Sequence, residues 1–251
     1  MKKTNIVFLH GFPFTHAAWA PQIQFFKKNE KWNAFAYDLR GHGAAGVLPK
    51  PGPWMIADFA EDLKKIMDHM KMGKAVLCGV SMGGYIALHF ASQNIDRVEA
   101  LILSDTQAGA DSNEAKDKRH ATMLKVRAAG IPEFAQDFAK NVLSESTLAH
   151  KPEVFQSIHK MILTNTVDNI TMTLGALASR KDSSDFLPKI NCPTLVIVGE
   201  HDKVTPVEVN EKLAAGIKGS VFKKVPNAGH LPNIEQPDIF NKICEEFLLS
   251  L

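Results

Sequence analysis

Residues 75–84 read Ala-Val-Leu-Cys-Gly-Val-Ser-Met-Gly-Gly, an apolar run that ends in a serine between small residues. A serine in a tight turn from a strand into a helix holds its hydroxyl clear of the sheet, and the crowded backbone requires small residues two positions before and after it. Gly79 and Gly83 occupy those positions around Ser81. The helix would also direct free N–H groups and its positive dipole end at developing negative charge. We therefore predict a strand at 75–79, a helix at 82–93 and a nucleophilic Ser81, the alternative being an ordinary glycine-rich turn.

Short apolar, β-branched runs recur on both sides of this segment, with helical patterns between them. The further strands are expected at residues 5–9, 33–39, 100–104, 194–199 and 220–225. Helices are expected at about 17–28 and at 56–70, where the apolar residues repeat with helical spacing. Strands that alternate with helices form parallel sheets. The sequence predicts an α/β fold with a mostly parallel central sheet of about six strands, flanked by helices.

The alternation breaks between residues 106 and 185, where four helix-like patterns follow one another without a strand-like run. They lie near residues 113–129, 132–143, 152–164 and 169–179. An all-helical insertion of this kind usually lies over the carboxyl ends of the strands, where α/β proteins place their sites. We expect a helical cap at 107–185, inserted before the penultimate strand of a core formed by 1–106 and 186–251, within one structural domain.

A nucleophilic serine needs a base, and the base needs an acid that orients it. His230 follows the sixth expected strand in a loop of small residues, and Asp202 follows the fifth. The resulting order, Ser81, Asp202, His230, is that of one serine-hydrolase scaffold and differs from the others. Asp105, at the end of the fourth expected strand, is the alternative acid.

The loop after the first strand reads His-Gly-Phe-Pro at residues 10–13. Gly11 allows a sharp backbone turn, and Pro13 stiffens the exit while offering no N–H group. An oxyanion hole takes one N–H from the residue after the nucleophile and another from a loop such as this one. The predicted donors are the backbone N–H groups of Phe12 and Met82.

Residues 41–46 match the G-x-G-x-x-G pattern of dinucleotide sites, which must open a helix so that the pyrophosphate meets the helix N-terminus. Pro49, Pro51 and Pro53 follow and disfavour a helix, so residues 38–43 are interpreted as a structural turn. The phosphate-binding pattern G-x-x-x-x-G-K and the zinc pattern H-E-x-x-H do not occur in the sequence. We expect no cofactor and no metal.

The chain has 251 residues, with 29 Lys and Arg against 27 Asp and Glu, and a hydrophobic content of 45%. This balance favours a globular domain without an electrostatic footprint for nucleic acid. Three scattered cysteines are too few for a disulfide framework, and no stretch approaches the ~20 apolar residues of a membrane span. We expect a cytoplasmic protein that acts on a small molecule without contacting nucleic acid or a membrane, and no pattern indicates an oligomeric state.

The motifs HGFP, DLRGHG, GVSMGGY, LVIVGEHD and NAGHLPNIEQP together resemble the α/β-hydrolase fold family, in its bacterial carboxylesterase and 3-oxoadipate enol-lactonase-like branch. The resemblance implies a nucleophile elbow at Ser81, a catalytic triad of Ser81, Asp202 and His230, and a serine esterase that cleaves a carboxylic ester or lactone through an acyl-enzyme. The alternatives on the same triad are an enol-lactonase, a C–C bond hydrolase, a lyase or a cofactor-free perhydrolase. A non-enzymatic receptor that kept the fold is the alternative from another class.

Overall fold

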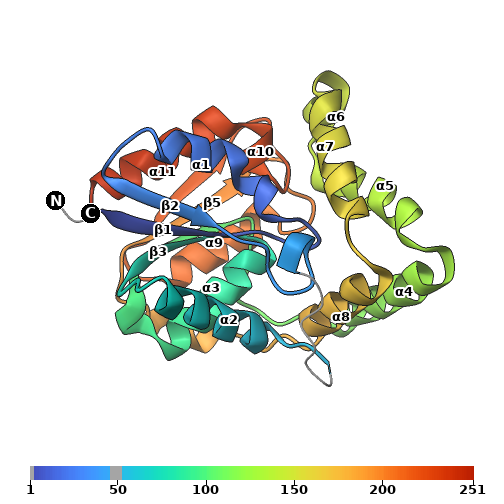
Figure 1. Cartoon of the computed structure of the whole chain (residues 1–251), viewed down its shortest axis with the longest axis horizontal. Helices are drawn as coiled ribbons and strands as arrows, with labels where there is room; N and C mark the ends of the chain where they lie inside the picture. Colours follow the sequence, from blue (N-terminus) through green and yellow to red (C-terminus); the bar gives the residue numbers. More distant parts are fainter. Residues whose placement is uncertain (1–2, 46–52) are drawn as a thin grey trace.

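Six short segments form the strands of one parallel sheet in the computed structural model, which describes residues 3–45 and 53–251. The strand order is β2-β1-β3-β4-β5-β6, and every neighbouring pair is parallel (Figure 1). The predicted fold class is confirmed. The strands are β1 (Thr4–Leu9), β2 (Trp32–Ala36), β3 (Ala75–Val80), β4 (Val98–Ser104), β5 (Thr194–Gly199) and β6 (Val221–Val225).

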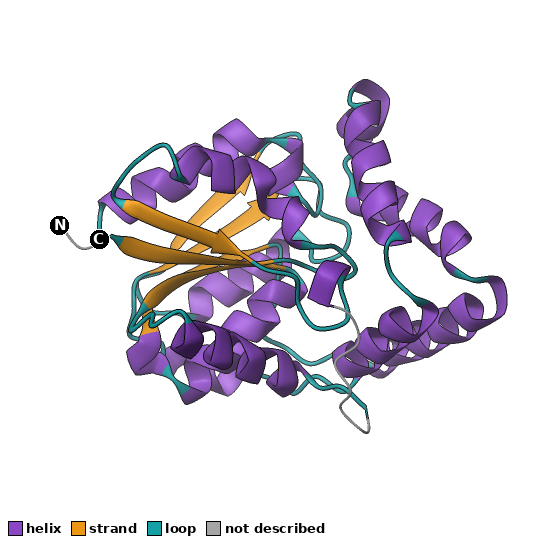
Figure 2. Cartoon of the chain, viewed as in Figure 1, coloured by secondary structure: helices purple, strands orange, loops and turns teal. Residues whose placement is uncertain are grey.

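Helices cover both faces of this sheet (Figures 1 and 2). One face carries α1 (Ala20–Phe26) and α11 (Pro237–Leu249), and the other carries α2 (Ile56–His69), α3 (Met82–Gln93) and α9 (Val207–Gly216). Every residue of β3 and β5 is buried, as expected for central strands of a parallel sheet. The shorter helices are α10 (Pro232–Glu235), η1 (His16–Trp19), η2 (Gly43–Ala45), η3 (Ile95–Arg97) and η4 (Ser184–Lys189).

The second strand ends earlier than its apolar pattern indicates. β2 pairs with β1 as far as Phe8 and Ala36, and residues 37–39 then leave the sheet. The N–H of Leu39 donates instead to the ring of His10. This side-chain bond replaces a ladder bond, which explains why the strand is shorter than predicted.

The segment between β4 and β5 contains a series of helices at the carboxyl ends of the strands (Figure 1). The short helix α6 was not predicted, because its six residues are too few for a readable periodicity; the hydroxyl of Ser144 caps it by accepting from the N–H of Thr147 at 3.1 Å. The inserted helices are α4 (Asn113–Ala129), α5 (Ile131–Val142), α6 (Glu145–His150), α7 (Pro152–Leu163) and α8 (Val167–Ala178).

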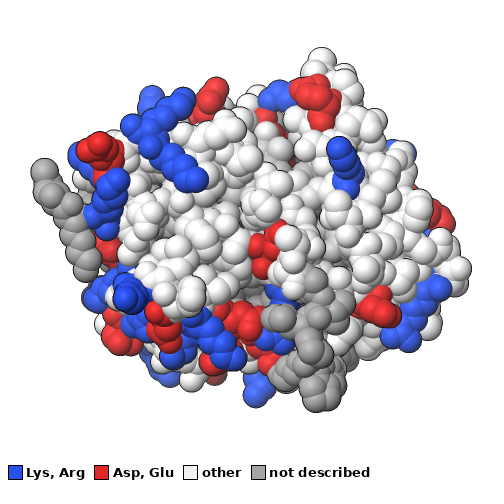
Figure 3. All heavy atoms as spheres, viewed as in Figure 1, with Lys and Arg blue, Asp and Glu red and all other residues white. Residues whose placement is uncertain are grey.

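The surface carries both signs of charge. On the face shown in Figure 3, Lys and Arg are interspersed with Asp and Glu along one edge, while most of the middle is uncharged. In the described part of the chain, no helix has both the length and the apolar character needed to cross a bilayer.

The turn between β3 and α3 packs directly against the end of β1. A Cβ on Gly83 would collide with the carbonyl group of Leu9, and a Cβ on Gly79 would collide with the backbone of Gly83 and stand 2.6 Å from the nitrogen of Gly84. Backbone atoms cannot move aside as side chains do. Glycine is therefore required here by close approach of the backbone.

Replacing Gly83 by alanine should destabilise the protein by about 3 kcal/mol or more, because the new methyl group meets backbone atoms in a packed core. Gly73→Ala is the matched control, since nothing lies within 4 Å of where its Cβ would stand. That control should shift stability by less than about 1 kcal/mol. Urea denaturation of the two variants checks this, and equal unfolding free energies would contradict it.

Candidate active site

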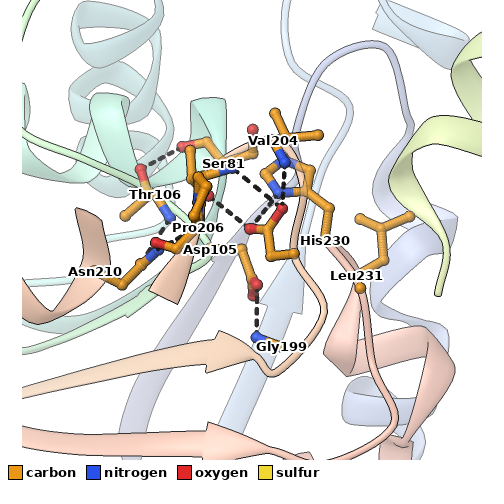
Figure 4. Close-up of polar contacts among 12 residues, drawn as sticks. Ser81, Asp105, Thr106, Gly199, Val204, Pro206, Asn210, His230 and Leu231 are labelled. Atoms are coloured by element: carbon orange, nitrogen blue, oxygen red, sulfur yellow. Dashed lines mark hydrogen bonds and ion pairs between the residues drawn. The ribbon is translucent and has the colours of Figure 1, made fainter. Parts of the chain in front are cut away.

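The candidate site lies where the chain leaves the carboxyl ends of the strands, the usual place for a site in an α/β sheet (Figure 4). The residues proposed from the sequence all follow strands: Phe12 follows β1, Ser81 and Met82 follow β3, Asp105 follows β4, Asp202 follows β5 and His230 follows β6.

Ser81 has a backbone conformation that non-glycine residues seldom adopt, with φ 54° and ψ −116°. Its N–H donates to the carbonyl of Ser104 at 2.9 Å. Its own carbonyl accepts from the hydroxyl of Thr106 at 2.8 Å and from the N–H of Gly84 at 2.9 Å. The surrounding structure thus holds a strained residue in place, which is common where a side chain has to be presented.

Asp202 and His230 are hydrogen-bonded and both are buried. The Nδ1 of His230 donates to Oδ2 of Asp202 at 2.8 Å, and the hydroxyl of Thr205 donates to the same oxygen at 2.7 Å. The other oxygen, Oδ1, accepts from the N–H groups of Val204 and Thr205. Burial alone would raise the pKa of Asp202, but its neighbours, above all His230, lower it below the usual value. Asp202 is therefore ionised, and the imidazole carries its proton on Nδ1, which leaves Nε2 as the basic nitrogen.

Asp105 lies beside this pair in a buried position with φ 47°. Its carboxyl group accepts from the N–H of Gly199 at 2.8 Å and from the hydroxyl of Ser104 at 2.6 Å. Burial, followed by the charge of Asp202, raises the pKa of Asp105 well above its usual value. Two neighbouring buried carboxyl groups do not both ionise, so Asp105 keeps a proton. The alternative acid is thus close to His230, but Asp202 holds the imidazole.

One donor atom from each of Asp105, Asp202 and His230 lies within 4.8 Å of the others, an arrangement that could hold a metal ion. The Nδ1 of His230 and the Oδ2 of Asp202 already bond to each other. A metal would have to displace that bond and the proton in it.

The loop that carries His230 is held from two sides. The N–H of His230 donates to the carbonyl of Val142, at the end of α5, at 2.8 Å. The buried carboxylate of Glu235 accepts from the N–H groups of Gly229 and Ser144, both at 2.8 Å. The sequence reasoning missed Glu235; the only signal was an acidic residue a few positions after the candidate base.

The two expected oxyanion donors lie in buried backbone. A Cβ on Gly11 would stand 3.2 Å from the Cβ of Ser81, so the loop after β1 runs past the serine. Within residues 3–45 and 53–251, no protein acceptor takes the N–H of Phe12 or that of Met82. Unpaired buried N–H groups are rare and are expected where a ligand atom is to be bound.

The glycine-rich turn after β2 is held by Asp38, as a structural turn should be. The carboxylate accepts from the N–H of His16 and the N–H of Ala44, both at 2.8 Å. A Cβ on Gly41 would collide with the ring of Trp54. Gly46, Pro49 and Pro51, which entered the argument against a dinucleotide site, lie outside the described residues.

A groove of about 390 Å³ runs between Phe12 and the inserted helices. The ring of Phe138 lies 5.8 Å from that of Phe12 and 5.3 Å from that of Phe134, measured between centroids. Charged side chains of α4 and α5 also line the groove, among them Lys118, Arg119, Lys125 and Asp137. It therefore offers an apolar, aromatic wall that starts at the residue carrying one of the unpaired amides.

The protonated state of Asp105 makes stability depend on pH. The pKa of Asp105 is higher in the folded than in the unfolded chain. Above the pKa of the unfolded chain, folding therefore takes up a proton, and the free energy of unfolding falls as the pH rises. Asp105→Asn removes this uptake. Above roughly pH 4, the free energy of unfolding of the variant should rise relative to that of the parent by up to about 1.4 kcal/mol per pH unit.

Urea denaturation at several pH values between 5 and 8 measures this difference. Asp96→Asn, at an exposed carboxylate, is the matched control. Its unfolding free energy should differ from that of the parent protein by the same amount at every pH. A constant difference between Asp105→Asn and the parent over this range would show that Asp105 ionises as freely in the folded chain as in the unfolded one.

Comparison with known proteins identifies the family to which the chain belongs. The family model described as alpha/beta hydrolase fold matches residues 4–237. The 3-oxoadipate enol-lactonase 2 of Acinetobacter baylyi is 29% identical over 244 residues, which cover 96% of this chain and 86% of the relative.

Two solved structures are similar over nearly the whole chain. A thermophilic esterase from Thermogutta terrifontis is 37% identical with a TM-score of 0.93, covering 99% of this chain and 90% of the esterase. The enol-lactonase from Burkholderia xenovorans is 28% identical with a TM-score of 0.90, covering 99% of this chain and 92% of that protein. These comparisons confirm the resemblance inferred from the motifs. The chain belongs to the α/β-hydrolase fold family, as the order of its strands and the residues at their ends already indicated.

Proposed function

We propose that this protein is a serine hydrolase that cleaves a carboxylic ester or lactone through an acyl-enzyme, with Ser81, His230 and Asp202 as its catalytic triad. The observation that carries the proposal is the buried bond from His230 Nδ1 to an ionised Asp202, together with a strained serine at the start of α3. The esterases and enol-lactonases among its relatives support a carboxylic ester hydrolase.

In the proposed reaction, Nε2 of His230 takes the proton from the hydroxyl of Ser81 as that oxygen attacks the carbonyl carbon. The negative charge that develops on the carbonyl oxygen is stabilised by the unpaired N–H groups of Phe12 and Met82. His230 then protonates the leaving alkoxide, and an acyl-enzyme remains. A water molecule, deprotonated by His230, hydrolyses it. Asp202 keeps the imidazole in the required tautomer and stabilises the imidazolium.

The inserted helices complete the proposal. We assign residues 107–185 to a cap and residues 1–106 and 186–251 to the catalytic core. The groove beside Phe12 is bounded by α4, α5 and α8 of that cap, and its aromatic wall suits an apolar acyl or alcohol group.

A lactone is the second candidate substrate. Two relatives named 3-oxoadipate enol-lactonase match 96% and 98% of the chain, which supports this candidate. Hydrolysis of a lactone would use the same residues, with the leaving alkoxide still attached to the acyl group. Comparing kcat/KM for a panel of p-nitrophenyl esters with kcat/KM for simple lactones distinguishes the two substrate classes.

Ser81→Ala should lower kcat/KM for p-nitrophenyl butyrate by about 10⁴-fold or more, because no other group in the proposed triad can form the acyl-enzyme. A fluorophosphonate should label the parent protein and fail to label this variant. Ser146→Ala, at an exposed serine of α6, is the matched control. Substantial residual turnover by Ser81→Ala would refute the mechanism.

Phe138→Ala should lower kcat/KM for p-nitrophenyl octanoate by roughly tenfold while kcat/KM for the acetate changes little, because only a long acyl chain reaches past Phe12 as far as Phe138. Phe155→Ala is the control, since the ring of Phe155 stacks on His159 of α7 and does not line the groove. Equal losses for both esters would show that Phe138 only packs the inserted helices.

A further inference from the structure

His10 is a buried histidine that the proposed triad does not use. Its ring bridges two loops: Nε2 accepts from the N–H of Leu39 at 2.9 Å, and Nδ1 lies 2.9 Å from the carbonyl oxygen of Gly11. A backbone N–H can only donate and a carbonyl can only accept. The bonding partners therefore fix a neutral imidazole with its single proton on Nδ1.

The surroundings of His10 keep it in this form. Burial is the main cause that lowers its pKa, to about 3, and the neighbouring His42 lowers it further. The carbonyl of Gly11 and the carboxylate of Asp38 act in the opposite direction, and His16 is a minor lowering influence. The ring consequently stays neutral throughout the range in which an ester hydrolase works.

The bond to Gly11 determines the orientation of one particular peptide group. The carbonyl of Gly11 accepts from Nδ1 of His10 and also from the N–H of Phe14 at 3.0 Å. In a trans peptide the C=O of one residue and the N–H of the next point in opposite directions. The Gly11–Phe12 peptide is trans, since the cis bond of this loop is the one after Phe12. Whatever holds the Gly11 oxygen therefore also sets the direction of the Phe12 N–H, for which the described part of the chain supplies no acceptor.

We propose that His10 is a positioning residue of the oxyanion hole, which holds the Gly11–Phe12 peptide so that the Phe12 N–H meets the developing oxyanion. The inference rests on the proposed function and adds to it a residue that never touches substrate. The N–H of Leu39 fixes the far side of the ring, so the direction of the donor depends on a contact in the loop after β2. A purely structural histidine would affect folding alone, whereas a positioning residue affects kcat at unchanged substrate binding.

Two substitutions separate these roles, because asparagine places its amide near the position of Nδ1 and glutamine places its amide near that of Nε2. His10→Asn keeps a donor for Gly11 and loses the bond to Leu39. His10→Gln keeps an acceptor for Leu39 and loses the donor. We expect His10→Gln to lower kcat by about 10- to 100-fold with KM changed less than about threefold, and His10→Asn to retain kcat within about fivefold.

The affinity of a trifluoromethyl ketone, which forms a tetrahedral adduct on the serine, should fall in parallel with kcat/KM in His10→Gln. His69→Asn and His69→Gln, at an exposed histidine of α2, are the controls for the substitutions themselves. Urea denaturation of the His10 variants reports any general loss of stability. Equal kcat values in the two His10 variants, or a larger loss in His10→Asn, would overturn the proposal.

Nitrogen NMR of the parent protein tests the inference without any substitution. The ring of His10 should show a protonated Nδ1 and a bare Nε2 from pH 5 to 9. A proton on Nε2, or on both nitrogens, would overturn the proposal even if the variants failed to fold. If the parent protein cleaves no ester or lactone, the proposed function fails, while the tautomer of His10 is still decided by this measurement.

Discussion

The approach of the turn after β3 to the end of β1 is the constraint on which the candidate site depends. Gly83 lies so close to Leu9 that it has no room for a Cβ, and a Cβ on Gly11 would stand only 3.2 Å from that of Ser81. This contact brings the first N–H groups of α3 next to the amides of the loop after β1. Backbone packing thus places two amides beside one serine, and within the described residues neither amide has a protein acceptor.

The charges at the site also follow from close packing. Asp105 and Asp202 end neighbouring strands of the sheet and are both buried, so only one of them can carry a charge. The choice between them is made by hydrogen bonds. Asp202 accepts from Thr205, Val204 and the imidazole. Among the described residues, Asp105 accepts only from Gly199 and Ser104. A fixed negative charge thus lies on the side of the imidazole away from its basic nitrogen.

Much of this fold could be predicted from the sequence, because buried parallel strands read as continuous apolar runs and the segment between β4 and β5 reads as a series of helix-like patterns. The candidate site residues could be predicted because each follows a strand, and all parallel strands end at one edge. The end of β2 could not, since it depends on a bond between Leu39 and His10. The short helix α6 gave no periodic signal. The proton on Asp105 depends on how closely the segments after β4 and β5 approach each other. The lining of the groove by Phe138 depends on which face of α5 is turned toward it.

The loop that carries His230 shares its hydrogen bonds with the inserted helices. Its backbone donates to Val142, and Glu235 ties it to Ser144. The insertion is consequently not a detachable module, since exchanging it for another would release the imidazole from part of its support. In a lineage that keeps this arrangement, new substrate preferences would arise through single replacements on the groove-facing sides of α4 and α5, while the end of α5 is preserved. Because the backbone of His230 bonds to Val142, a movement of α5 would also displace Nε2 of His230.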